Sequence, residues 1–376
     1  MEERRGFMAI STQGGKPLLL LDNLCLFYGS EAFTLSVTEG EALSLMGEEP
    51  GVLSRLCDIL AGFDKPVGGR ILLAGQDMTT CLPERRPIVL VSPRDPVFGH
   101  LGVSENIGFP LRVQGARPDT LHARIARVMA LTGLEALATT RADRLTPEQA
   151  LRLKLARALA YAPAILVLDD VLSGLDMRSA AKARQLLSTL QRALGLSMIY
   201  AARGREDALW LGGRIALFDR ETLIQCADAA TLLERPSDPR SAGLFGEANL
   251  LTGRVLAIEE DIARVHLACG GVVEAMADEA LEEDSLCTLC VRPDRMTPLF
   301  GTTVAGDDDT PPLVASIQSV LHAGDQIRLR LRLADGAEID MRRPLLQSMR
   351  AIKPGATLQL AWQASQAVAF PMKDDL

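Results

Sequence analysis

The feature that most constrains the fold is a regular alternation of apolar strands and amphipathic helices between about residues 16 and 245. RILLAG, PIVLVS and AILVLDD have the composition of buried strands, whereas DTLHARIARVMALTGLEAL repeats its apolar residues with the 3.6-residue period of a helix. Strands that alternate with helices in this way form a mainly parallel sheet with helices on its faces. The sequence therefore predicts an α/β domain over residues 16–246, preceded by an N-terminal extension over residues 1–15.

A different pattern begins near residue 247, where apolar and polar residues alternate, as in IARVHLACGGVVEAM and IRLRLRLADGAEIDM. Alternation with period two is typical of half-buried strands. We therefore expect an all-β region over residues 247–372, built as one or two small barrels. The turn-rich stretch GTTVAGDDDTPP, residues 301–312, predicts a linker that divides this region into two halves.

Charge and terminal composition exclude several classes of protein. The 376 residues carry a formal net charge of −8, which argues against a nucleic acid or an anionic lipid surface as the main partner. The first residues, MEERRGFMAISTQGGKP, lack the apolar stretch of a signal peptide, and no run reaches the length of a membrane span. We expect a cytoplasmic chain with reduced cysteines.

The cysteines and histidines predict no metal site. Cys287 and Cys290 lie three residues apart in the strand-like run LCTLCV, so their side chains should point to opposite faces and pack as ordinary apolar residues. The four histidines are far apart in the sequence: His100, His122, His266 and His322.

The stretch SLMGEEPGVLSRLCDILAG, residues 44–62, has the frame of a phosphate-binding loop: an apolar strand, a glycine, a polar turn and an amphipathic helix. The pattern G-x-x-x-x-G-K-[ST] aims backbone N–H groups at phosphate and closes the cage with a lysine ammonium. Gly47 and Ser54 fit the first glycine and the hydroxyl. Val52 and Leu53 stand where the second glycine and the lysine belong, so the frame is present without its chemistry.

The other loop residues oppose phosphate binding. Pro50 lacks an N–H donor, and Glu48 and Glu49 would repel phosphate by a few kcal/mol at an effective dielectric of about 20. Leu53 forgoes about 1.5–3 kcal/mol of charge-assisted contact, whereas millimolar to micromolar affinity amounts to about 4–8 kcal/mol in total. The two carboxylates either stabilise the helix N-terminus in place of an anion or face solvent. The degenerate loop comprises Gly47, Glu48, Glu49, Pro50, Gly51, Val52, Leu53, Ser54 and Arg55.

The order of the elements and several strings resemble the ATP-binding subunit of ABC importers, in the subfamily with a C-terminal TOBE-type domain that serves sugars, polyamines, iron or oxyanions. LVLDDVLSGLD resembles a Walker B strand followed by a D-loop, VFGHLGVSENIGFPLR resembles the segment that receives a permease's coupling helix, and VRPDRM resembles a TOBE motif. The resemblance covers nearly the whole chain. It implies a P-loop NTPase-like nucleotide-binding domain, with a helical subdomain over about residues 100–160, and an OB-like TOBE barrel. It also implies ATP and magnesium as ligands, although the degenerate loop predicts impaired binding.

The family's LSGGQ signature, which presents a helix N-terminus to ATP on the opposite subunit, corresponds here to LTPEQ, Leu145 to Gln149. Thr146 and Gln149 have the spacing of a capping box, and Pro147 suits the first helical position. Glu148 would present the wrong charge to phosphate. The string predicts an ordinary helix start.

Five further positions follow from the resemblance. Asp169 fits the Walker B aspartate that supports magnesium, and Asp170 replaces the glutamate that polarises the attacking water with a side chain one methylene shorter. Arg203 stands at the switch histidine and is expected to neutralise both aspartates through ion pairs. Pro93 stands at the Q-loop glutamine. Tyr28 matches the aromatic that stacks on adenine, or else is a packed surface aromatic.

Surfaces that serve assembly fit the family better than the catalytic motifs do. The D-loop residues are Ser173, Gly174, Leu175 and Asp176, and the permease-docking residues are Phe98, His100, Leu101, Val103, Glu105 and Asn106. This contrast predicts a pseudo-ATPase subunit that pairs with an intact ATPase chain and docks on a permease at the inner face of the membrane. The alternatives are a soluble regulatory or ligand-sensing protein and a weakly active ATPase.

Overall fold

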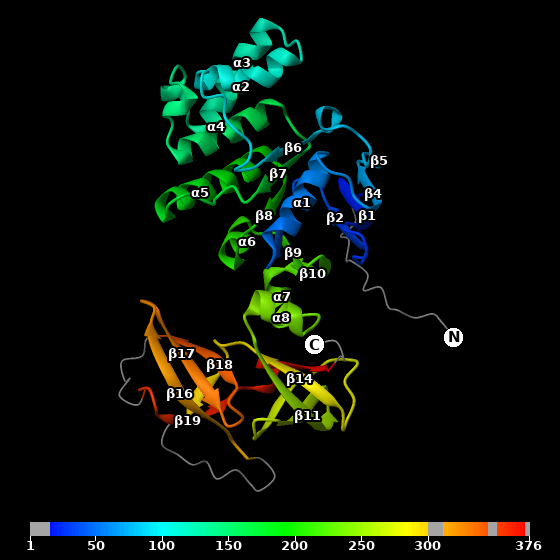
Figure 1. Cartoon of the computed structure of the whole chain (residues 1–376), viewed down its shortest axis with the longest axis vertical. Helices are drawn as coiled ribbons and strands as arrows, with labels where there is room; N and C mark the ends of the chain where they lie inside the picture. The colour runs from blue at the N-terminus through cyan, green and yellow to red at the C-terminus, as the bar shows by residue number, and fades with distance from the viewer. Residues whose placement is uncertain (1–15, 300–310, 345–351, 373–376) are drawn as a thin grey trace, which may run out of the picture. The chain divides into compact units, whose positions relative to one another are not determined.

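The computed structural model describes residues 16–299, 311–344 and 352–372 (Figure 1). The chain divides into two compact units, Met1–Ala229 and Ala230–Leu376. The predicted N-terminal extension and most of the predicted linker lie outside the described residues. None of the described helices is long and apolar enough to cross a membrane.

The first unit is built on a six-stranded sheet with the strand order β10-β9-β3-β8-β7-β6. Its strands are parallel except for β10, which pairs antiparallel with β9, so the predicted α/β class is confirmed. Every residue of β7 and β8 is buried, which explains their continuous apolar composition. The strand bounds are β3 Ala42–Gly47, β6 Ile88–Val91, β7 Ile165–Asp169, β8 Ser197–Ala201, β9 Arg214–Asp219 and β10 Thr222–Asp228.

A second, antiparallel sheet with the order β2-β1-β4-β5 belongs to the same unit. Its strands are β1 Leu19–Cys25, β2 Phe33–Val37, β4 Gly68–Leu73 and β5 Gln76–Asp77. Helix α1, Pro50–Ala61, contributes Leu53, Leu56 and Ile59 to one hydrophobic core with residues of both sheets. The helix that follows the degenerate loop is therefore a core element.

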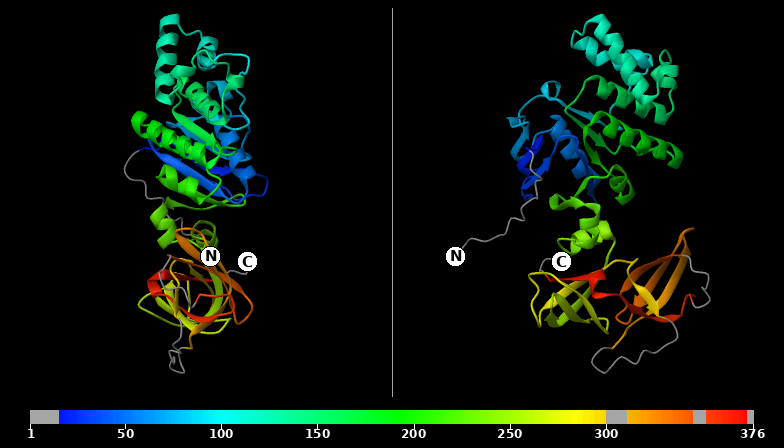
Figure 2. Two further views of the ribbon diagram at one scale, coloured as in Figure 1. Left: turned by 90° about the vertical axis from the view of Figure 1, so that its left-hand side faces the viewer. Right: turned by 180° about the vertical axis from the view of Figure 1, so that it is seen from behind.

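Three helices pack around a core of their own in the first unit: α2 Val103–Val113, α3 Pro118–Thr132 and α4 Pro147–Ala160. Figures 1 and 2 show α2 and α3 at the end of this unit that is remote from β9 and β10. The remaining helices are α5 Met177–Leu194 and α6 Arg205–Leu211, with short 3-10 turns at η1 Pro83–Arg85, η2 Glu135–Leu137 and η3 Ala142–Arg144.

The second unit is mainly β. After α7 Ala229–Glu234, at the unit boundary, and α8 Pro239–Gly246, a closed barrel forms in the order β11-β12-β13-β20-β14, and a second sheet has the order β15-β19-β16-β17-β18 (Figure 2). The barrel strands are β11 Asn249–Glu259, β12 Ile262–Leu267, β13 Val272–Ala277, β14 Leu286–Val291 and β20 Ala367–Pro371, with η4 Ala364–Gln366 before the last. The second sheet comprises β15 Thr297–Leu299, β16 Leu313–His322, β17 Gln326–Leu333, β18 Glu338–Pro344 and β19 Thr357–Ala361. Burial alternates along β17, as the sequence pattern predicted.

Cys287 and Cys290 face opposite sides of β14, as predicted. Cys287 lies in the barrel core, whereas Cys290 packs with Ala242 and Phe370. Burial raises the pKa of Cys287 to about 11 and that of Cys290 further still, so both thiols remain protonated at neutral pH.

Candidate functional site

The degenerate loop keeps the backbone frame of a phosphate-binding loop. Gly47 ends β3 where a Cβ atom would come within 2.8 Å of the main-chain oxygen of Phe218, so only glycine fits there. Glu49 takes the N-cap position of α1, with Pro50 in the first turn. The Glu49 side chain makes no capping hydrogen bond, and both Glu48 and Glu49 are exposed. The structure therefore supports the solvent-facing alternative for these carboxylates.

Val52 and Leu53 are packed inside the first unit. Their side chains are 5% and 3% exposed, and both belong to the core that α1 shares with the two sheets. Position 53, where a phosphate-binding loop carries its lysine, is thus a core position. The next residue, Ser54, is only half-buried and turns its hydroxyl toward β7.

Asp169, at the C-terminal end of β7, is 3% exposed and receives donors on both carboxylate oxygens. Ser54 Oγ donates to Oδ1 at 2.8 Å, and Arg94 Nη2 donates to Oδ2 at 3.0 Å. The same guanidinium donates to both carboxylate oxygens of Asp58 on α1, at 3.0 and 2.9 Å. The hydrogen bond to Asp58 raises the pKa of Arg94, and Asp169 raises it further. Arg94 therefore bridges two aspartates.

The prediction for Arg203 is half right. Its Nε atom lies 3.1 Å from Asp170 Oδ2, which confirms that pair. Its predicted pairing with Asp169 is wrong, because Arg94 neutralises Asp169 instead. The sequence reading considered only the glutamine lost at Pro93. The arginine directly after that proline was the available signal.

Asp170 and the D-loop hold a strained turn. Asp170 has a positive φ of 46°, and Ser173 Oγ donates to its main-chain oxygen at 3.0 Å. Burial raises the pKa of the Asp170 carboxyl, although Arg203 opposes that shift. Asp176 caps α5 by accepting from the N–H groups of Arg178 and Ser179, both at 2.9 Å. Gly174, with φ of 79°, and the half-buried Leu175 complete the D-loop.

The signature-like string is a capped helix start, as predicted. The Gln149 N–H donates to Thr146 Oγ1 at 3.3 Å, and the Thr146 N–H donates back to Gln149 Oε1 at 3.0 Å. Pro147 is the first residue of α4, and Leu145 packs against the helical core. Glu148 is paired with Arg152 one turn later, at 2.5 Å, so its charge is neutralised within the helix.

Tyr28 is 93% exposed, so the expectation of a packed surface aromatic is wrong. Its neighbour Phe27 packs instead, with the Arg55 guanidinium 4.3 Å from the ring centroid. Arg55 also pairs with Asp64, at 3.1 Å between Nε and Oδ2. The Arg55 guanidinium thus contacts Phe27 and Asp64.

Part of the docking string is structural, which corrects the prediction. Val103 and Asn106 are fully buried, so neither can contact a partner. The Asn106 side chain accepts from the Phe98 N–H at 2.9 Å and donates to the carbonyls of Phe98, Leu101 and Gly102. Glu105 accepts from the Gly102 N–H at 2.8 Å and so supports the start of α2. The remaining docking residues are half-buried or exposed: Phe98, His100 and Leu101.

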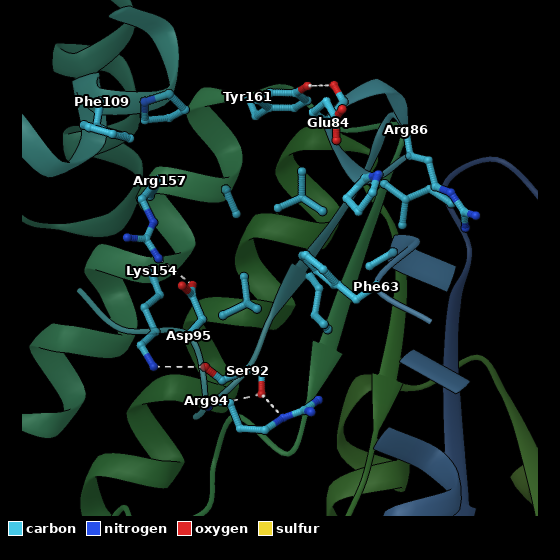
Figure 3. A pocket seen from close by; sticks show the side chains of 18 of the residues that line it. Phe63, Glu84, Arg86, Ser92, Arg94, Asp95, Phe109, Lys154, Arg157 and Tyr161 are labelled. Atoms are coloured by element: carbon cyan, nitrogen blue, oxygen red, sulfur yellow. Dashed lines mark hydrogen bonds and ion pairs between the residues drawn. The ribbon is translucent and has the colours of Figure 1, made fainter. Parts of the chain in front are cut away.

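An apolar groove of about 830 Å³ opens beside this string (Figure 3). Its walls come from β6, α2, α4 and the end of α1, and its exposed apolar residues include Phe63, Phe109 and Val113. Phe98 packs on Phe109 with ring centroids 4.6 Å apart. Phe98 and Phe109 both lie in the string that the sequence analysis assigned to permease docking, whereas Phe63 on the opposite wall was not predicted. No motif points to Phe63, because it joins the groove only through folding.

Arg86 is a second residue that the sequence did not reveal. It is 2% exposed and donates to four backbone carbonyls, those of Ile59, Leu60, Thr79 and Cys81. Its guanidinium therefore satisfies the C-terminal end of α1. A Cβ atom on Gly62, the residue after the end of α1, would lie 2.7 Å from Arg86 Nε. Desolvation lowers the pKa of Arg86.

The parallel sheet with a loop-to-helix frame, followed by a β-barrel unit, defines the class of ABC nucleotide-binding domains joined to TOBE domains. The family model for the ABC transporter matches residues 31–173, and that for the TOBE domain matches residues 289–370. The spermidine/putrescine import ATP-binding protein PotA of Rubrobacter xylanophilus is 30% identical over 370 residues, covering 96% of this chain and 95% of that protein. PotA 2 of Pseudomonas aeruginosa is 28% identical and covers 92% of this chain and 97% of its own.

A solved structure has a similar fold over 61% of this chain. It is cbiO1 from Clostridium perfringens, described as part of the ABC transporter complex cbiONQ, with a TM-score of 0.54 and 21% identity, covering 61% of this chain and 96% of its own. This chain belongs to the family of ABC importer ATP-binding subunits that carry a TOBE domain.

Proposed function

We propose that this chain is a pseudo-ATPase: an energy-coupling subunit that does not hydrolyse ATP alone and works in an ABC import complex with an intact ATPase chain. The observation that carries the proposal is the burial of Leu53 at the lysine position, because a core side chain offers no group to phosphate. In such a complex the chain would lie at the inner face of the membrane, held there by a permease.

The residues present do not fit a magnesium ion. Magnesium needs nearly octahedral oxygen coordination at short distance. Here both oxygens of Asp169 already accept hydrogen bonds from Ser54 and Arg94, and the Arg94 guanidinium brings a fixed positive charge to the carboxylate. This arrangement supports the proposed loss of ATP hydrolysis.

The signature-like string adds independent support. A family signature would read the nucleotide of the opposite subunit, but here Thr146 and Gln149 satisfy the helix N-terminus themselves. We therefore expect that a homodimer of this chain would form no competent site. The partner ATPase chain would have to supply its own catalytic residues.

The apolar groove is the proposed permease contact. Phe63 and Val113 are 68% and 74% exposed, and large apolar side chains at the rim of a groove are typical of a helix-docking site. The relatives are named as import ATP-binding proteins, and cbiO1 is described as part of a transporter complex. Of the predicted docking residues, we keep Phe98, His100 and Leu101 as candidates for the contact.

Affinity purification of the tagged chain from membranes of its own host tests the proposal. We expect an intact ATPase chain and a permease to copurify in fixed ratio, and the chain alone to show no ATPase activity. Val113→Glu should abolish copurification of the permease without lowering the thermal stability of the chain. Val314→Glu, at a residue 41% exposed in the second unit, is the matched control. Recovery of the chain only in the soluble fraction would favour the regulatory alternative.

A further inference from the structure

Arg94 joins three segments of the first unit that are far apart in sequence. It follows Pro93 in the loop between β6 and α2, and its guanidinium reaches Asp58 on α1 and Asp169 at the end of β7. Ser92 Oγ lies 3.3 Å from Asp169 Oδ2 and also accepts from the Arg94 N–H at 3.2 Å. Ser54, Ser92 and Arg94 thus all contact the buried carboxylate of Asp169.

We propose that the Arg94 guanidinium is a built-in cation that replaces the divalent metal at this site and holds it in one arrangement without metal or nucleotide. The inference deepens the proposed function and rests on its claim that the chain does not hydrolyse ATP. It assigns to Arg94 a role that no motif gives to this position.

The geometry suits arginine in particular. A planar guanidinium can engage one carboxylate with two parallel bonds and still offer a hydrogen to a second acceptor, whereas an ammonium cannot hold both in this way. Arg94 does this with Asp58, at 3.0 and 2.9 Å, and with Asp169, at 3.0 Å. Asp169 is the more dependent partner, because its side chain is only 4% exposed and removing the cation would leave a buried charge unpaired.

The same loop, residues 92–96, is fixed from its other side by α4 (Figure 3). Lys154 Nζ donates to the carbonyls of Ser92 and Pro93, at 2.9 and 3.3 Å. Arg157 pairs with Asp95 at 2.5 Å and donates to the Pro96 carbonyl at 3.1 Å. The backbone of the loop is therefore held from the side of the helices as well, which keeps the Arg94 main chain beside Asp169.

Thermal unfolding of the full chain, in EDTA and in millimolar magnesium chloride, tests the inference. We expect the same Tm in both solutions for the natural chain. Arg94→Met should lower Tm by about 3–6 °C in EDTA, because the loss of a partner for a buried charge lowers the free energy of unfolding of the first unit. Adding Asp169→Asn to that variant should recover part of the loss, because the unpaired charge is then gone.

Arg70→Met is the matched control, since Arg70 makes an exposed ion pair with Asp22, with 2.7 Å between Nη2 and Oδ2. This pair does not involve Asp58 or Asp169. This variant should leave Tm nearly unchanged. If Arg94→Met does not fold, Arg94→Lys and Asp58→Asn give the same test, and both should lower Tm. A rise of the natural chain's Tm with magnesium alone would overturn the inference, and so would equal effects of the Arg94 and Arg70 variants.

The outcome is separable from that of the proposed function. Magnesium is the only probe, and neither ATP nor a permease enters the measurement. A chain that copurifies with a permease but gains stability from magnesium would refute the built-in cation and leave the docking proposal standing. A chain whose Tm does not depend on magnesium but that stays alone in the soluble fraction would support the built-in cation and refute the docking proposal.

Discussion

At the scale of single residues, three acids at the degenerate positions each have a basic partner within the chain. Asp169 pairs with Arg94, Asp170 with Arg203 and Glu148 with Arg152. Buried or half-buried carboxylates need such partners, because desolvation penalises an unpaired charge. These three carboxylates are therefore neutralised by side chains of the same chain.

Restoring the lysine of the phosphate-binding pattern should not restore ATP binding. Leu53→Lys places a charged side chain at a core position that is 3% exposed, so we expect a loss of at least about 2 kcal/mol in the free energy of unfolding. Isothermal titration calorimetry should detect no ATP binding. Leu53→Met is the control and should cost less than about 1.5 kcal/mol. Tight ATP binding by the lysine variant would refute this account of the loop.

Asp170 should give a stability that depends on pH. Burial raises the pKa of its carboxyl, so the stabilisation by the neutral form is complete below the unfolded pKa of about 3.9 and is lost as the pH rises through the folded pKa. Asp170→Asn should therefore unfold at higher temperature than the natural chain at pH 7, and the difference should vanish below about pH 4.

Asp176→Asn provides a control of opposite sign. Hydrogen bonds from the Ser179 N–H and hydroxyl are the main reasons that the pKa of Asp176 is lowered, so its stabilisation is present above the unfolded pKa and is lost as the pH falls through the folded one. This variant should be less stable than the natural chain at pH 7. Thermal unfolding followed by circular dichroism across this pH range measures both variants, and equal signs would contradict the assignment.

The residues that the sequence predicted well follow either from local spacing or from the resemblance. The capping box at Thr146 follows from spacing, and the pair between Arg203 and Asp170, which are distant in sequence, follows from the two resembled motifs. Arg94 was missed because no motif links it to its partners, Asp58 and Asp169, which lie 36 and 75 residues away. Single-sequence reasoning does not place such distant segments side by side.

At the scale of elements, the starts of α4 and α5 are determined by their own sequence. Asp176 caps α5, and Thr146 and Gln149 cap α4 reciprocally. The sequence also distinguished strands from helices. Apolar residues repeat every two positions in β17 and every 3.6 positions in α3. The sequence predicts Asn106 as a docking residue because it does not reveal that this side chain is buried and hydrogen-bonded to the Phe98 main chain.

The cap of α4 should contribute measurably to stability. Thr146→Ala removes the acceptor for the Gln149 N–H, so we expect a loss of about 1 kcal/mol and a fall in Tm of about 2–4 °C. Thr146→Ser keeps the hydroxyl and should stay close to the natural chain. The same loss in the serine variant would show that packing of the threonine methyl, rather than capping, is responsible.

At the scale of the whole molecule, the two units have separate hydrophobic cores. The core of the second unit includes Val255 and Leu289 from the barrel and Leu331 from the second sheet, whereas the two cores described above for the first unit consist of residues before Ala229. The change of hydrophobic period led the sequence analysis to predict a division near residue 247, whereas the two compact units meet at Ala229 and Ala230. The closure of the barrel by β20 was not visible in the sequence, because β20 joins β13 and β14 from the far end of the chain.

Separate cores predict separate unfolding transitions. Leu289 is fully buried in the barrel, so Leu289→Ala should cost about 2–5 kcal/mol and should lower only the transition of the second unit. Leu53→Met serves as the comparison in the first unit. Differential scanning calorimetry measures both, and one transition that moves as a whole would show that the units unfold together.

The packing of Val52 and Leu53 also bears on whether this loop could regain its chemistry one substitution at a time. A return to glycine at position 52 would empty a packed site, and a return to lysine at position 53 would bring a charge into the core. Each single step passes through a less stable protein that still lacks phosphate binding, because Glu48, Glu49 and Pro50 remain. Selection would have no intermediate to favour, so the loss of phosphate binding at this loop is difficult to reverse by single substitutions.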